Sequence, residues 1–87
     1  MLPFQETKLS DNEFIRVFSQ DTDSGDFMWH RDYEDRMIES INDTDWKIQI
    51  DNQLPTKIDG KVFIPKGVYH RLIKGNGDLE IKLQKLN

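Results

Sequence analysis

The sequence predicts an all-β fold, a small antiparallel β-barrel or sandwich. Two segments alternate apolar and polar residues with a period of two, DWKIQID at 45–51 and DLEIKLQKL at 78–86. Such alternation is typical of a strand with one buried face, whereas a helix would repeat every three or four residues. Turn signals at 59–60, 65–67 and 75–78 separate the candidate strands at short intervals. We therefore expect roughly six to eight short strands and less than about one-fifth helix.

The first half of the chain contains two candidate strands, FIRVFS at 14–19 and RMIESI at 36–41. A polar stretch, SQDTDSGD at 19–26, is typical of the loop that follows the first of them. Near residues 10–13, a serine or an aspartate could cap one short helical turn. This is the only helical segment that we expect.

The second half contains four more candidate strands, at 45–51, 61–65, 69–74 and 79–85. The two middle ones, KVFIP and YHRLIK, are short and rich in β-branched or aromatic residues. We expect Gly75-Asn76-Gly77 to close a hairpin between the last two strands, because glycine and asparagine adopt the positive φ angles of tight hairpin turns.

Composition indicates one folded domain that comprises residues 1–87. Apolar residues make up 36% of the chain, and two Trp, two Tyr and five Phe supply large side chains for a core. We expect Trp29 and Trp46 to lie in that core or in a dimer interface. The chain has no cysteine, which excludes disulfides and thiolate metal sites. It has no long apolar run either, so we expect a cytoplasmic protein without a membrane span.

The net charge of −4 is unevenly distributed along the chain. Residues 1–51 carry 5 basic and 13 acidic side chains, whereas residues 52–87 carry 7 basic and 3 acidic ones. Solvated strand faces that pair across a sheet would account for this pattern, and a positive rim around an anionic ligand is the alternative. An acidic chain with no basic-aromatic stripe is not expected to bind nucleic acid.

The two histidines of the chain, His30 and His70, are candidate metal ligands together with Asp32. Residues i and i+2 of a strand point to the same face, about 6.6 Å apart along the strand, so His30 and Asp32 could converge on one ion. Two imidazoles and one carboxylate suit one divalent transition metal, particularly Fe(II), with Mn, Ni and Zn as alternatives. The simpler alternative is that His30 pairs with a neighbouring carboxylate on the surface and that His70 is structural.

The segment GKVFIPKGVYH at 60–70 resembles the second motif of the cupin superfamily, in which a glycine, a short apolar strand and Pro-x-Gly precede a histidine. This Pro-x-Gly turn would reverse the chain and direct His70 into the barrel. The segment WHRDYEDRMIESI at 29–41 occupies the place of the first motif, which usually contains His-x-His followed by a glutamate. The resemblance implies a cupin barrel, which is a double-stranded jelly roll, with His30, Asp32 and His70 around one metal ion.

Three positions depart from the cupin pattern. Asp32 stands in place of the second histidine, and Lys74 stands where an asparagine usually follows the last histidine. Arg36 falls at the position of the usual glutamate, unless Asp35 or Glu39 takes that place. An inward Arg36 would repel a cation and could instead bind a carboxylate or phosphate.

The resemblance implies a small metal-dependent enzyme that binds a small polar or anionic molecule in the barrel mouth. Oxygen-dependent oxidation is the leading chemistry, with metal-assisted isomerisation or lyase chemistry behind it. Glu34, on the same predicted strand face as Asp32, is the candidate base. A non-enzymatic cupin that binds a ligand without metal, or a purely structural dimer, is the alternative.

We also expect a homodimer. In EFIRVFS, Phe14 and Phe18 share one strand face, and Ile15 and Val17 share the other. One barrel interior can bury only one of these two sets, so the other needs a partner surface or an outer layer.

Overall fold

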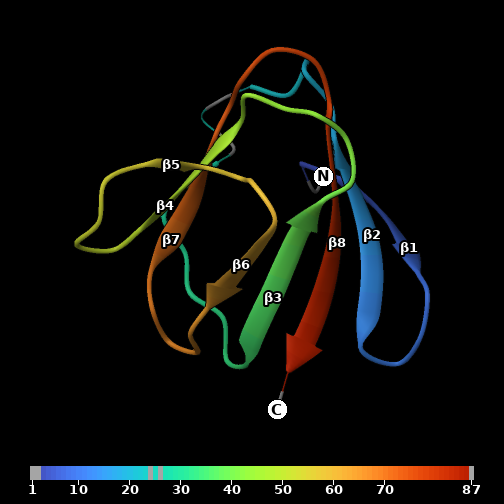
Figure 1. Cartoon of the computed structure of the whole chain (residues 1–87), viewed down its shortest axis with the longest axis vertical. Helices are drawn as coiled ribbons and strands as arrows, with labels where there is room; N and C mark the ends of the chain where they lie inside the picture. The colour runs from blue at the N-terminus through green and yellow to red at the C-terminus, as the bar shows by residue number, and fades with distance from the viewer. Residues whose placement is uncertain (1–2, 24, 26, 87) are drawn as a thin grey trace.

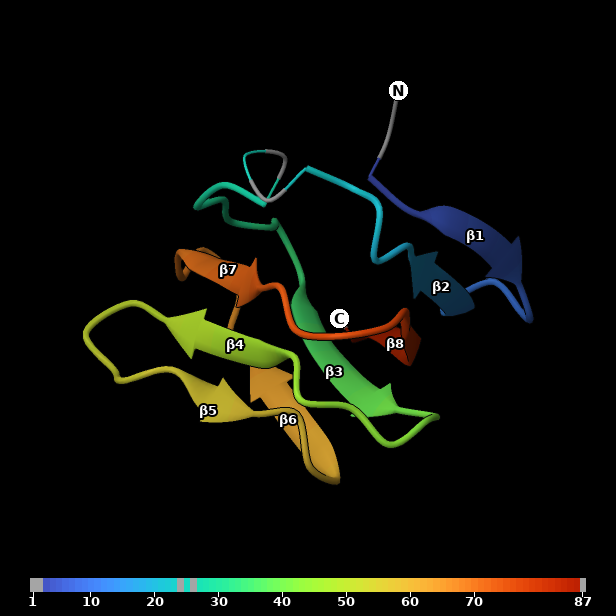
Figure 2. The same cartoon turned by 90° about the horizontal axis from the view of Figure 1, so that it is seen from above.

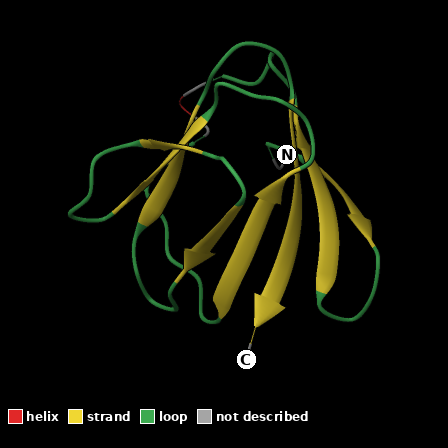
Figure 3. Cartoon of the chain, viewed as in Figure 1, coloured by secondary structure: helices red, strands yellow, loops and turns green. Residues whose placement is uncertain are grey.

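A computed structural model describes residues 3–23, 25 and 27–86 of the chain, which form eight strands (Figure 1). The strands are β1 (Gln5–Lys8), β2 (Glu13–Phe18), β3 (Asp35–Ser40), β4 (Lys47–Ile50), β5 (Thr56–Lys57), β6 (Lys61–Ile64), β7 (His70–Ile73) and β8 (Leu79–Leu86). All pairings between them are antiparallel. The described residues contain no α-helix, and hence none that could cross a membrane. Figure 3 shows strands joined by loops, which confirms the predicted all-β class.

The strands form two sheets that face each other (Figure 2). One sheet has five strands in the order β1-β2-β8-β3-β6, and the other has three in the order β5-β4-β7. Alternate residues of the central strands point into the space between the sheets, as Ile38 and Leu83 do at paired positions of β3 and β8. Ile48 of β4 packs into the same buried cluster from the three-stranded sheet. The core is therefore the barrel interior that the sequence predicts.

Of the two tryptophans, only Trp46 is a core residue. Its side chain is fully buried, and the rings of Phe18 and Phe27 lie at centroid distances of 6.2 and 5.4 Å. Trp29 is 42% exposed, and the guanidinium of Arg71 lies over its ring. Trp29 therefore lies outside the core of the single chain, because it belongs to an irregular segment rather than to a strand, and its place in a dimer interface stays a prediction.

The expected hairpin between 69–74 and 79–85 is wrong as well. β7 pairs with β4 in the three-stranded sheet, whereas β8 lies between β2 and β3 in the five-stranded sheet. The connection between β7 and β8 therefore crosses from one sheet to the other instead of turning back on itself (Figure 1).

Asp45 and Trp46 bind this crossover. Trp46 Nε1 donates a hydrogen bond to Gly77 O at 2.9 Å. The Asp45 carboxylate accepts from the backbone and the side-chain amides of Asn76, at 2.8 and 3.0 Å. These contacts with a segment about thirty residues away outweigh the local turn preference of Gly75-Asn76-Gly77.

The N-terminal half also differs from the prediction. The stretch 10–13 is not a helical turn, since it closes the hairpin between β1 and β2 and Leu9 N donates to Glu13 O at 2.9 Å. The Ser10 hydroxyl does not cap a helix, since it donates to the side-chain oxygens of Asn12 and Glu13. The sequence gives no signal for the strands β1 and β5, because QETK and TK are polar throughout and show no apolar alternation.

Gly75 lies where the crossover passes closest to the residues before β4. A Cβ atom at this position would lie 2.7 Å from Trp46 N and 2.8 Å from Asp45 C, and backbone atoms cannot rotate away as a side chain can. We predict that Gly75→Ala destabilises the protein by about 1–3 kcal/mol in urea denaturation. Gly25→Ala is the matched control, because a Cβ there meets only the Asp23 side chain at ordinary contact distance. It should change the stability by less than about 0.5 kcal/mol, and equal stability of the two variants would contradict the crossover contact.

Candidate metal centre

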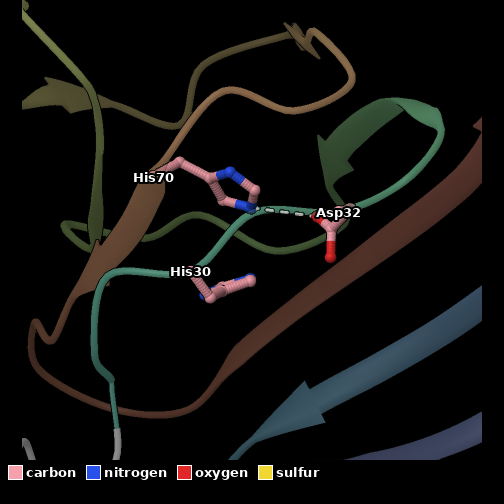
Figure 4. Close-up of side chains that lie close together, drawn as sticks. All are labelled: His30, Asp32 and His70. Carbon is pink, nitrogen blue, oxygen red and sulfur yellow. Dashed lines mark ion pairs between the residues drawn. The ribbon is translucent and has the colours of Figure 1, made fainter.

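His30 and His70 face each other across a backbone bridge between the segment before β3 and the start of β7. His30 N donates to His70 O at 3.0 Å, and His70 N donates to His30 O at 2.8 Å. Side chains of directly opposed residues in an antiparallel pair lie on the same face. The two imidazoles therefore come together, with ring centroids 4.3 Å apart (Figure 4), although 40 positions separate them in the sequence.

The expectation that His30 and Asp32 lie on one strand is wrong. Residues 27–34 are irregular apart from the single bridge at His30, and β3 begins only at Asp35. The backbone of Asp32 is held instead by the Pro-x-Gly turn, because Gly67 N donates to Asp32 O at 2.9 Å. Gly67 has a φ of 77°, a left-handed conformation that glycine adopts without strain. This turn therefore places the carboxylate as well as the histidine that follows it.

His30, Asp32 and His70 each offer one ligand atom, and these atoms lie within 4.8 Å of one another. The distance from Asp32 Oδ2 to His70 Nε2 is 3.2 Å. With metal–ligand bonds of about 2.1 Å, neighbouring ligand atoms of a tetrahedral or octahedral centre lie about 3.0–3.4 Å apart. A small movement of His30, the exposed member of the group, would give this spacing for all three. The geometry therefore fits one divalent ion.

Backbone carbonyls orient both imidazoles. His70 Nδ1 lies 3.0 Å from Val68 O, and His30 Nδ1 lies 3.2 Å from Met28 O. A carbonyl oxygen can only accept, so each Nδ1 carries the proton and donates it. In the neutral ring Nε2 then has a free lone pair, and in His70 it is this atom that faces the carboxylate of Asp32 (Figure 4). Metal-ligating histidines are commonly oriented in this way.

Burial favours the neutral form of His70. Desolvation of its ring, together with the charges of His30 and Arg36, lowers the pKa of His70 from the ordinary value of 6.5, against the opposing effects of Val68 O and Asp32. At neutral pH its Nε2 lone pair therefore points at Asp32 Oδ2. This oxygen is buried, and no described residue gives it a hydrogen bond. Two acceptors in contact repel each other unless a cation joins them, so this pair fits a metal ion.

Arg36 adds a cation of the protein to this site. Its Nη1 lies 3.4 Å from Asp32 Oδ2, without the geometry of a hydrogen bond. Its Nε and Nη2 donate to Glu34 Oε1 at 3.3 and 3.0 Å. The Asp32 and Arg36 side chains are only 12% and 13% exposed, so water screens their attraction weakly. Arg36 therefore offsets part of the charge of Asp32 and competes with a metal ion for it.

Of the three candidates for the usual glutamate position, only Arg36 is among the described residues that line the cavity between the sheets. Asp35 Oδ1 accepts from Lys66 N at 2.7 Å and so fixes the turn. Glu39 lies on the outer face of the sheet, next to Lys82. Of these three side chains, the one that faces the cavity beside the candidate ligands is thus positively charged.

Glu34, the predicted base, is not one of the described residues that line the cavity. Its Oε1 accepts two hydrogen bonds from Arg36 and lies 3.9 Å from Lys85 Nζ. These contacts give Glu34 a role in holding Arg36. Its role as a base stays a prediction.

A cavity of about 160 Å³ lies between the two sheets beside the candidate ligands. Apolar side chains such as Phe18, Ile48 and Leu83 form most of its wall. The polar members of the described lining all carry nitrogen, and they are Arg16, His30, Arg36 and His70. The wall can therefore hold an apolar molecule, and its two arginines offer that molecule donors.

Arg16 is a lining residue that the sequence analysis missed. It lies between Phe14 and Phe18 on the inward face of β2, and its guanidinium stacks on the Phe4 ring at 4.1 Å and pairs with Glu6. A single charge in the middle of an apolar strand face is the signal that could have revealed it.

Comparisons with solved structures show the cupin fold. A cupin-2 domain-containing protein from Shewanella frigidimarina matches with a TM-score of 0.66 and 16% identity, over 95% of this chain and 79% of that one. Fe(II) HppE matches with a TM-score of 0.64 and 12% identity, over 85% of this chain and 41% of that one. A chain from crystal structures of DMSP lyases gives a TM-score of 0.73 at 9% identity, over 86% of this chain and 37% of that one.

The chain thus spans less than half of the HppE and DMSP lyase chains, and most of the cupin-2 protein. No family model and no curated protein matches the sequence. At these identities the likeness defines the fold, and it is the fold that the Pro-x-Gly motif before His70 implies.

Proposed function

We propose that this chain is a small cupin-fold protein that binds one divalent transition metal ion through His30, Asp32 and His70. The observation that carries the proposal is the pair of facing acceptors, His70 Nε2 and Asp32 Oδ2, 3.2 Å apart. With Nδ1 of His70 donating to Val68 O, no hydrogen bond joins this pair in the neutral state, whereas a metal ion would bind both atoms. His30 supplies the third ligand from the same backbone bridge.

The ligand set supports an oxidative role. An ion held by two imidazoles and one carboxylate keeps positions for a substrate or dioxygen, which makes Fe(II) the leading metal and oxygen-dependent oxidation the leading chemistry. The residues of the chain would bind and enclose the second reactant, a small polar or anionic molecule. Both histidines lie in the wall of the cavity, so a molecule within it contacts them directly, and the apolar remainder of the wall excludes water.

A metal-free binding protein is the second candidate, and the position of Arg36 favours it. Its Nη1 lies 3.4 Å from Asp32 Oδ2, so the protein supplies a cation for this carboxylate by itself. The same charge would repel a metal ion. In this alternative, Arg36 serves as the donor to an anionic ligand.

We predict that protein without an affinity tag binds close to one equivalent of Co(II) or Zn(II) in isothermal titration. Asp32→Asn and His70→Gln should each weaken metal binding more than roughly 10–100-fold, which is the loss caused by mutating residues that only hydrogen-bond to a metal ligand. Asp43→Asn is the control, because it removes the same charge from an exposed loop residue outside the ligand group. The visible spectrum of the Co(II) protein would report on the ligands independently of the affinity.

Unchanged affinity in His70→Gln would contradict the proposed ligand set. A wild-type protein that binds neither ion would favour the metal-free candidate, provided that it still binds an anion in the cavity.

We also propose that the chain forms a homodimer. Phe14 and Phe18 pack on the core, whereas Ile15 and Val17 alternate with them and point from the outer face of the five-stranded sheet. A second copy would cover this outer pair. Sedimentation equilibrium at micromolar concentration should give about twice the chain mass of 10.3 kDa, and a single-chain mass throughout would contradict the dimer.

A further inference from the structure

The described lining of the cavity carries positive charge, whereas the chain as a whole is acidic. The protein carries a net charge of −4, yet no carboxylate is among the described residues that line the cavity. Its polar lining consists of two arginines and two histidines, and the remainder is apolar. A wall of this kind favours a molecule that has one anionic group and an apolar body.

The volume limits the size of that body. A cavity of about 150 Å³ with apolar walls holds a benzene-sized molecule. The cavity in this chain measures about 160 Å³, so one ring or a chain of about six carbon atoms would fill it.

The charges around Arg36 identify the anchor for the anionic group. Arg36 and Lys85 share the carboxylate of Glu34, and the only other carboxylate bonded to or paired with Arg36 among the described residues is that of Asp32. Once Asp32 binds a divalent ion, the negative charges of Asp32 and Glu34 face the positive charges of Arg36, Lys85 and the ion. The positive charges then exceed the negative ones by two.

Arg16 does not share this surplus, because its guanidinium pairs with Glu6 and stacks on the Phe4 ring. Arg36 also has donors to offer. Its described hydrogen bonds use Nε and Nη2, whereas Nη1 only lies near Asp32 Oδ2 at 3.4 Å. Arg36 Nη1 is thus the donor next to the metal ligands that gains most from an incoming carboxylate.

We propose that the cavity binds a small monocarboxylate with an apolar body of about one ring, and that Arg36 anchors its carboxylate through Nη1. This inference rests on the proposed function, since it names the ligand class of the same site. The carboxylate offsets the repulsion between Arg36 and the metal ion, so the ion and the monocarboxylate bind cooperatively. Linkage requires that each raises the affinity of the other by the same factor.

Benzoate is a suitable probe, and benzamide is its neutral counterpart of the same shape. In calorimetric titrations of metal-depleted and Zn(II)-loaded wild-type protein, benzoate should bind at least about tenfold more tightly than benzamide, and Zn(II) should strengthen benzoate binding alone. Arg36→Met should reduce benzoate binding to the level of benzamide. The control Arg16→Met, a change of the same kind in the same cavity, should keep the preference for benzoate.

Zn(II) binding by Arg36→Met separates a lost anchor from a damaged fold. Removal of the repelling charge should raise the Zn(II) affinity of this variant while benzoate binding falls, whereas a misfolded variant would lose both. Arg36→Lys keeps the charge without the planar guanidinium, so it should retain part of the benzoate preference.

Equal affinity of the wild type for benzoate and benzamide would overturn the proposal. Loss of the benzoate preference in Arg16→Met with retention in Arg36→Met would overturn the assignment of the anchor. Absence of Zn(II) binding would contradict the proposed function alone. The described lining has two arginines and no carboxylate even without the ion, so the comparison of benzoate with benzamide on metal-depleted protein still decides the ligand class.

Discussion

The two backbone hydrogen bonds between His30 and His70 are the interaction on which the candidate site depends. They join the first residue of β7, in the three-stranded sheet, to the segment that leads into β3 of the five-stranded sheet. A typical backbone hydrogen bond contributes only about 0.5–1.5 kcal/mol to stability, but this pair also fixes the register. A slip by one residue would turn an imidazole to the other face and separate the two rings. The Gly67–Asp32 bond then adds the carboxylate to the same place.

Asp32 links the fold to the chemistry of the site. Its Oδ2 is buried without a hydrogen bond from any described residue, and a buried acceptor left in this state costs about 1–3 kcal/mol. His70 cannot satisfy it in the neutral state, and Arg36 approaches without a hydrogen bond. A cation bound between Asp32 and His70 would remove this cost. Arg36 already attracts Asp32 Oδ2, so a metal ion must compete with the guanidinium for this oxygen. The metal affinity depends on the outcome of that competition.

The fold class was predictable because the alternation at 45–51 and 78–86 is a local property of strands with one buried face. The delivery of His70 to the site was predictable for a similar reason, since the Pro-x-Gly turn depends on residues that adjoin it. The crossover at Gly75-Asn76-Gly77 was not, because Asp45 and Trp46 decide its course from a distant part of the chain.

The convergence of His30 with Asp32 was predicted for the wrong reason. The sequence suggests a shared strand face, whereas a bridge to His70 and a bond from Gly67 position the two residues separately. Arg16 was missed because both faces of β2 carry apolar residues, so the sequence does not indicate which face is inward or that a charge on it lies beside a cavity. The ion pair of Arg16 with Glu6 depends on the register between β1 and β2, which short-range sequence patterns do not specify.

X-ray absorption spectroscopy of the Zn(II)-loaded protein, prepared without an affinity tag, tests the central claim most directly because it reports the ligands themselves. The structure predicts a shell with two imidazole nitrogens and at least one carboxylate oxygen at about 2.0–2.2 Å, completed by solvent or an added anion. Multiple scattering from two imidazole rings would identify His30 and His70, since the chain has no other histidine. A shell of oxygen atoms alone, or one with a single imidazole, would contradict the account.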